Sequence, residues 1–170
     1  MINTLALNSL TNLDEYNCGG FALCIEDWYS PDEYDEGQNM SDMLEDCANS
    51  IQKDFPELTR VSDYFDIPDE LDVIGFRLSI GEEDDDEWDD ERQQYVGTGE
   101  LHEFVTDFHF ILRSGGIWYH KPGGRPIKRV YFDIDGEWPH NGWNYNSDIV
   151  WFVRPHMDIE KFFIIDQGED

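Results

Sequence analysis

Apolar residues recur at helical spacing in two segments near the start of the chain. In the first segment, from about Asn17 to Tyr29, the apolar positions are Cys18, Phe21, Ala22, Ile25, Trp28 and Tyr29. In the second they are Met40, Met43, Leu44, Cys47, Ala48, Ile51 and Phe55, after which Pro56 ends the pattern. This spacing brings apolar side chains to one face of a helix and therefore predicts two amphipathic helices. Asn17 is available as the N-cap of the first.

The later part of the chain shows the pattern of β-strands. Aromatic and β-branched residues form the runs LDVIGFRLSI, EFVTDFHFILR, GIWYHKPG, RVYFDI and DIVWFVRP, and Gly, Pro and Asn separate the last four. Such runs between turn residues indicate antiparallel strands joined by tight turns. Gly115 and Gly116 favour a hairpin between the second and third runs. Helices followed by a sheet predict an α+β domain.

A block of like charge follows the first of these strands. Nine of the ten residues from Glu82 to Glu91 are acidic. Because like charges repel and cannot pack together, we predict a solvated acidic loop or insertion at about residues 81–100 of a single domain over 1–170. Loose calcium binding and mimicry of a phosphate backbone are the alternatives. The block lacks the spacing of a defined calcium loop, and DIDG at 133–136 is too partial a motif, so no metal or cofactor site is predicted.

Composition and charge narrow the class of protein. Aromatic residues make up 15% of the chain, which favours a folded domain over a disordered acidic tail. The formal net charge is −28, and residues 1–100 hold 28 of the 39 acidic residues. Such a surface repels nucleic acid phosphates and anionic membranes, and it favours cationic partners. We therefore expect no direct binding to nucleic acid or to a membrane.

The start of the chain and the cysteines indicate a compartment. No Lys or Arg precedes Lys53, so the basic region of a secretory signal is missing, and no run approaches the roughly 18 apolar residues of a membrane span. Three cysteines, Cys18, Cys24 and Cys47, favour free thiols over a disulfide framework. We expect a cytoplasmic protein.

Cys18 is the candidate nucleophile because it is predicted to begin a helix. The free N–H groups of a helix start lower the pKa of a thiol. Gly19 and Gly20 would occupy the first turn, where they cost helix propensity but allow another chain or a substrate to approach the backbone closely. Cys47 lies on an apolar helix face and is expected to be core, and Cys24 is interpreted in the same way.

Two of the five histidines are placed to become neighbours. The candidates are His102, His109, His120, His140 and His156. His109 and His120 lie in consecutive predicted strands on either side of the Gly115–Gly116 turn, so a hairpin brings them together. With Cys18 they would supply a nucleophile, a general base (His109) and an orienting residue (His120). Five basic residues lie in or beside these strands, at Arg113, Lys121, Arg125, Lys128 and Arg129, and would offset the acidic field around the thiol.

These motifs resemble those of the NlpC-type papain-like cysteine peptidases. NCGGFA resembles their DCSGF-type nucleophile motif, and HFILRSGGIWYH resembles the segment in which a catalytic histidine is followed about a dozen residues later by a polar orienting residue. The pair NC-x-x-FAL and DFHFILRSGGIWYHKPGG also looks like bacterial and phage proteins of unassigned function. The resemblance implies a papain-like fold, with N-terminal helices packed on a C-terminal antiparallel sheet. It also implies a peptide or protein substrate, which includes peptides of the cell wall.

The sequence departs from the motifs of that family in three places. Asn17 replaces Asp, Gly19 replaces Ser, and 91 residues separate Cys18 from His109.

The sequence is consistent with two functions. The leading hypothesis is a cysteine hydrolase or acyltransferase acting on an amide or peptide bond. The alternative is a non-enzymatic acidic inhibitor of phage type, built on the same fold without its activity, that occupies the basic groove of a nuclease. Its contacts would come from Glu82, Glu83, Asp84, Asp85, Asp86 and Glu87.

Overall fold

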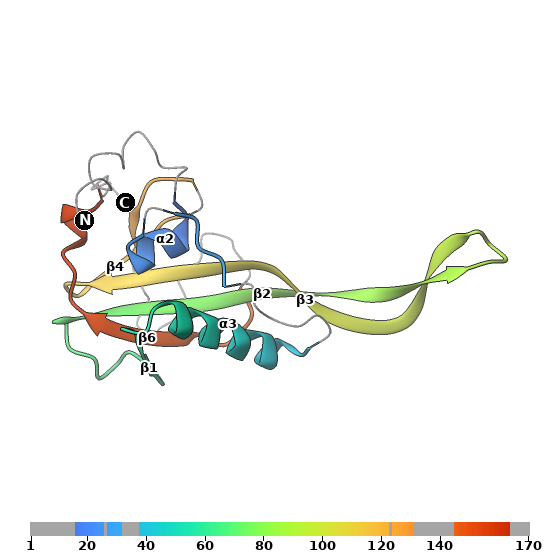
Figure 1. Cartoon of the computed structure of the whole chain (residues 1–170), viewed down its shortest axis with the longest axis horizontal. Helices are drawn as coiled ribbons and strands as arrows, with labels where there is room; N and C mark the ends of the chain where they lie inside the picture. Colours follow the sequence, from blue (N-terminus) through green and yellow to red (C-terminus); the bar gives the residue numbers. More distant parts are fainter. Residues whose placement is uncertain (1–15, 26, 32–37, 123, 131–144, 164–170) are drawn as a thin grey trace.

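The chain forms a six-stranded antiparallel sheet with few helices, shown by a computed structural model (Figure 1). The structure describes residues 16–25, 27–31, 38–122, 124–130 and 145–163. The strands follow the order β1-β6-β2-β3-β4-β5 across the sheet. Their bounds are Thr59–Val61 (β1), Leu71–Asp89 (β2), Gln94–Ser114 (β3), Ile117–His120 (β4), Lys128–Val130 (β5) and Val150–Pro155 (β6). The helical elements are α2 (Cys18–Leu23), α3 (Met40–Asp54) and the 3-10 turn η2 (Ile159–Lys161).

Helix α3 confirms the second predicted helix. Its N-cap Asn39 accepts a hydrogen bond from the Asp42 N–H at 2.9 Å, which satisfies one of the free amides of the first turn. Its buried residues are Met43, Leu44, Cys47, Ala48, Ser50 and Ile51, and five of them belong to the predicted apolar face. Cys47 is therefore a core residue, as its position on that face predicted.

Helix α2 is shorter than predicted and ends at Leu23 instead of continuing to Tyr29. Cys24 adopts the left-handed conformation, with φ 62°, and its N–H caps the carbonyls of Gly20 and Phe21. The chain then turns back along the helix. A Cβ atom on Gly20 would lie 2.1 Å from the Asp27 carbonyl oxygen, so only glycine allows this return. The close approach that the glycine pair permits is therefore made by the protein's own chain.

Asn17 holds the returning segment against α2. Its Oδ1 accepts the Gly20 N–H at 2.9 Å, as an N-cap does, and also the Tyr29 N–H at 3.0 Å. Its Nδ2 donates to the Tyr29 carbonyl at 2.9 Å. One amide side chain thus caps the helix and pairs with the backbone of Tyr29, which fixes the position of Cys18 relative to that segment.

The sheet is buried on both faces where β2, β3 and β6 meet. One face packs against α2 and α3 through Ile74, Phe76, Leu78, Phe110, Leu112 and Phe152. The other face carries a smaller cluster of Val73, Ile111, Tyr145 and Trp151. Burial on both faces explains why these strands are almost continuously apolar in the sequence, without strict alternation.

The acidic block is part of a β-ribbon: most of the region predicted as a solvated loop or insertion at residues 81–100 is strand and not loop, and its side chains are mostly exposed. The outer halves of β2 and β3 pair from Glu82–Glu103 to Asp89–Gln94, with a register shift at Asp84–Asp86; another shift, at Ser79–Ile80, precedes them. Figure 1 shows this ribbon leaving the rest of the molecule as a long arm. Its partner strand, residues 94–103, supplies the backbone pairing while acidic side chains alternate between the two faces.

No helix in the described part of the chain is long and apolar enough to cross a membrane.

Candidate functional site

The two predicted histidines contact each other. Gly115 and Gly116 adopt positive φ values of 58° and 77° and close the hairpin between β3 and β4, as predicted. His109 Nε2 lies 3.0 Å from His120 Nδ1, and both side chains are buried. The His–turn–His spacing therefore gave the correct neighbours, and one imidazole can hold the other in a fixed orientation.

Both imidazoles are neutral at physiological pH. Burial, reinforced by the neighbouring His120, lowers the pKa of His109 to about 3. Burial, followed by the Lys128 charge, lowers the pKa of His120 to about 4. A neutral imidazole has one N–H donor and one acceptor nitrogen, so the short contact is a single hydrogen bond between the two rings.

Cys18 begins α2, as predicted, but its thiol is protonated. Burial is the main reason that its pKa rises to about 12, and the charge of Asp107 adds to the rise. Hydrogen bonds from the backbone of Phe110 and Gly19, and the charge of Lys121, act in the opposite direction. At rest, the thiol and both imidazoles are thus neutral, and there is no preformed thiolate–imidazolium pair.

An edge of the sheet brings Cys18 and His109 to a common cavity. Strand β4 pairs with β3 only over Leu112–Ser114, so among the described residues no strand covers the adjoining edge of β3 at residues 107–110. Helix α2 packs there, and the backbone of Phe110 reaches the Cys18 sulfur. Cys18 and His109 consequently line the same cavity, of about 370 Å³, with Asn17, Trp28, Tyr29, Ser30, Asp107 and Phe108. This volume is within the ~300–1,000 Å³ range of small-molecule sites.

Asp107 and Tyr145 belong to the site although neither was predicted. The Tyr145 ring stacks on the His109 ring with centroids 5.6 Å apart and planes 23° apart. Its hydroxyl donates to Asp107 Oδ2 at 2.9 Å. Asp107 lies two positions before His109 on β3, so both side chains are on the same face of the strand. The motif DFHF therefore contains the spacing that could have predicted Asp107 as a site residue. Tyr145 comes from NYNSD, where neither spacing nor a motif marks it.

The five basic residues near the histidines do not act as one group. Lys121 is fully buried, and its Nζ donates to the Tyr16 carbonyl at 2.6 Å and lies 4.5 Å from the Tyr16 ring centroid. Arg113 donates to the Ile67 carbonyl at 2.6 Å. Of the five, Lys121 is the one whose charge lowers the Cys18 pKa, and burial outweighs it.

The other described histidines, His102 and His156, contact carboxylates elsewhere in the structure. His102 is on the ribbon, between the carboxylates of Glu83 and Asp85. His156 Nδ1 contacts buried Asp72 at 2.9 Å and Ser114 Oγ at 3.4 Å. Because both contacts use the same ring nitrogen, they do not form a Ser-His-Asp relay, which needs both nitrogens. His140 lies outside the described residues.

Metal ligands are not grouped in the described part of the chain. No set of three or more His, Cys, Asp or Glu residues is arranged there to hold an ion. The DIDG motif at 133–136 lies outside the described residues. The chemistry that the site offers is that of a thiol, two imidazoles, a tyrosine and a carboxylate.

Comparison with known proteins gives no family for this chain. No protein-family model matches it, and neither a curated protein nor a solved structure is significantly similar to it. The resemblance to NlpC-type peptidases stays a prediction from the motifs around Cys18, His109 and His120.

Proposed function

We propose that this protein is a papain-like cysteine hydrolase or acyltransferase that acts on an amide or peptide bond. The observation that supports it most is the common cavity of Cys18 and His109, in which His109 is held by His120 at 3.0 Å. A nucleophile, a base and an orienting group are the parts that thiol-dependent acyl transfer requires. The packing of the cysteine helix on the histidine strands also fits a papain-like arrangement within an α+β fold.

The acyl transfer begins from neutral groups. Cys18 Sγ attacks the carbonyl carbon while its proton passes to His109, and the carbonyl π electrons move to oxygen. Since Nε2 of His109 contacts His120, the proton arrives at Nδ1. The imidazolium then returns the proton to the leaving amine as the C–N bond breaks. Water or another nucleophile attacks the resulting thioester and restores the thiol.

His120 and the backbone of α2 assist this sequence. In the imidazolium, His109 Nε2–H donates to His120 Nδ1, so the same hydrogen bond persists through both proton transfers. The Cys18 N–H lies in the first turn of α2, where helix amides have no intrahelical acceptor, and it can donate to the developing oxyanion. The nearby Asp107 carboxylate favours the imidazolium electrostatically.

Mechanism-based labelling tests this proposal. A peptidyl acyloxymethyl ketone should modify Cys18 in the folded protein, and peptide mapping by mass spectrometry identifies the modified thiol. His109→Ala should slow the labelling by at least about tenfold, because the base is lost. Cys24→Ala is the matched control, since Cys24 lines neither the cavity of Cys18 and His109 nor the adjoining one. Modification of Cys24 in place of Cys18, or labelling that is unchanged in His109→Ala, would contradict the proposal.

A second function rests on the acidic ribbon. The ribbon leaves the rest of the molecule (Figure 1). It exposes Trp88, Tyr95 and Leu101 beside the carboxylates. We propose that it binds the basic groove of a protein such as a nuclease, where carboxylates at Glu82, Glu83, Asp84, Asp85, Asp86 and Glu87 replace phosphates. An acidic face complements a basic one, and exposed aromatic residues supply contact area.

Binding measurements separate this function from the enzymatic one. Replacing 82–87 with Ser and Gly should abolish inhibition of a basic nuclease, and Cys18→Ala should leave inhibition intact. Affinity in the wild type should fall steeply as the salt concentration rises and the Debye length shrinks from roughly 10 Å toward 3 Å. Inhibition that survives the ribbon replacement would remove this proposal and leave the hydrolase proposal unaffected.

A further inference from the structure

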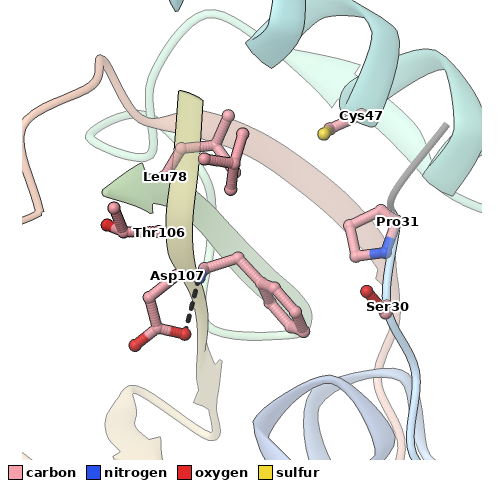
Figure 2. Close-up of a pocket in the computed structure, with 8 residues that line it drawn as sticks. Ser30, Pro31, Cys47, Leu78, Thr106 and Asp107 are labelled. Atoms are coloured by element: carbon pink, nitrogen blue, oxygen red, sulfur yellow. Dashed lines mark hydrogen bonds between the residues drawn. The ribbon is translucent and has the colours of Figure 1, made fainter. Parts of the chain in front are cut away.

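A second cavity adjoins the one that holds Cys18 and His109. It has a volume of about 280 Å³ and shares Ser30, Asp107 and Phe108 with the first. Figure 2 shows Leu78, Thr106 and Asp107 on the sheet side, Ser30 and Pro31 across from them, and Cys47 of α3 at a third side. A substrate bound at Cys18 therefore has a continuous path past Asp107 toward α3.

Asp107 is the one charged residue among the described residues that line this cleft. The others are apolar or neutral, and His109 is uncharged because burial lowers its pKa to about 3. Asp107 is exposed, and its carboxylate accepts hydrogen bonds from the Phe108 N–H at 2.8 Å and the Tyr145 hydroxyl at 2.9 Å. No basic side chain in the described part of the chain forms an ion pair with it. An ionised carboxylate has about four acceptor positions, so a further donor can bind.

The walls around Asp107 suit a cation on an aliphatic stem. Trp28 and Tyr29 line the cavity beside it, and aromatic faces attract ammonium and guanidinium groups. Leu78, Val105 and Phe108 offer apolar surface for methylene groups. The net charge of −28 also raises the local concentration of cationic ligands.

We infer that this cleft binds an acyl substrate with a lysine or arginine side chain beside the scissile bond, and that Asp107 is the counter-ion of that side chain. The inference rests on the proposed hydrolase function and names its substrate class.

Two matched probes test the inference. They are peptidyl acyloxymethyl ketones that carry lysine or norleucine, which differ in the terminal ammonium, and a glutamate probe completes the set. In each reaction Cys18 Sγ displaces the carboxylate leaving group and forms a thioether, and the thiol proton passes through His109 to solvent. The second-order rate of Cys18 modification is followed by intact mass spectrometry.

The lysine probe should react at least about tenfold faster than the norleucine probe, as expected for a charge-assisted hydrogen bond in a partly enclosed site. The glutamate probe should be the slowest. Asp107→Asn keeps an acceptor for Tyr145 and should bring the lysine and norleucine rates within about twofold of each other. Asp107→Lys should invert the order of lysine and glutamate. Glu100→Gln, which removes one exposed charge from the ribbon, should leave the lysine preference intact.

Different failures overturn different statements. Equal rates for lysine and norleucine in the wild type would overturn the substrate class, and so would an Asp107→Asn variant that slows both probes by the same factor. In either case, Cys18 labelling that still needs His109 would preserve the hydrolase proposal. Absence of Cys18 labelling by all three probes would overturn both.

Discussion

The inner and outer halves of the β2–β3 hairpin use the same pairing for opposite purposes. In the inner half, Ile74, Phe76, Phe110 and Ile111 are fully buried, and His109 lies among them without charge. In the outer half, Trp88 is 46% exposed and Tyr95 is 68% exposed, and most of the remaining side chains are carboxylates. The backbone ladder continues through both halves. The two halves differ in their surroundings. The inner half is packed among apolar side chains, where a charged group would be costly, whereas water solvates the carboxylates of the outer half.

Substitutions of the two histidines of the proposed site are expected to have the largest effect, a loss of turnover. Under the hydrolase proposal, His109→Ala should lower turnover of any substrate by about 10²–10⁴-fold, because Cys18 would lose its base. His120→Ala should lower turnover less, because the base remains and loses only its orientation. Steady-state kinetics on the same peptide measures both.

Replacement of residues 82–87 with Ser and Gly is the matched control in the outer half and should leave turnover within about twofold of the wild type. Turnover that is equal in the wild type and His109→Ala would remove the histidine from the mechanism.

The next effect is on stability. Phe110→Ala should lower the free energy of unfolding by about 3–5 kcal/mol, because it opens a cavity under α2 in a fully buried position. Trp88→Ala should cost less than about 1 kcal/mol, since its ring packs edge-on against Tyr95 in the solvent-exposed ribbon. Urea denaturation of the two variants gives the comparison, and similar losses would mean that the ribbon is packed against something in solution.

An intermediate effect is the dependence of stability on pH. The unfolded histidines titrate at about 6.5, whereas His109 and His120 titrate at about 3 and 4 in the fold. Below pH 6.5 the unfolded state therefore binds more protons, so the free energy of unfolding falls as the pH falls. Each imidazole contributes up to about 1.4 kcal/mol per pH unit.

Chemical denaturation at pH 7, 6 and 5 measures this slope, and the double variant His109→Gln, His120→Gln should flatten it. An unchanged slope in the double variant would mean that the two rings are already accessible to protons in the fold.

The sequence predicted those parts of the molecule that local patterns determine. The apolar face of α3 and the turn at Gly115–Gly116 are local, and the turn was enough to place His109 beside His120. The end of α2 was missed because Ile25, Trp28 and Tyr29 keep helical spacing. The left-handed Cys24 and the return of the chain onto Gly20 depend on tertiary contacts that spacing does not contain.

The ribbon and the stacking of Tyr145 on His109 were missed for related reasons. Repulsion between carboxylates argued for a loop or insertion, yet the acidic block is a strand. Its partner strand has only Glu100 and Glu103 as acids, so the carboxylates of the block can point to the two opposite faces of the ribbon. Tyr145 is 36 residues from His109 in the chain and reaches it only because the fold places residues 145–147 beside β2 and β3. Contacts of this kind require the topology, and the sequence contains no pattern for them.

The smallest expected effect sharpens the comparison within the outer half itself. Glu82 lies directly opposite Glu103 in the ladder, and like charges opposite each other are destabilising. Glu82→Lys converts this pair to opposite charges and should raise Tm by about 1–2 °C at low salt, falling toward zero at high salt. Glu87 lies opposite Val96, so Glu87→Lys changes the net charge equally without forming that pair. Differential scanning fluorimetry of the two variants therefore separates the effect of the cross-strand contact on Tm from the effect of a lower net negative charge.

Equal shifts in Tm would show that the stability of the ribbon depends on its total charge alone. A larger shift for Glu82→Lys would show that the register of the ladder determines the effect of each carboxylate even in the largely exposed ribbon.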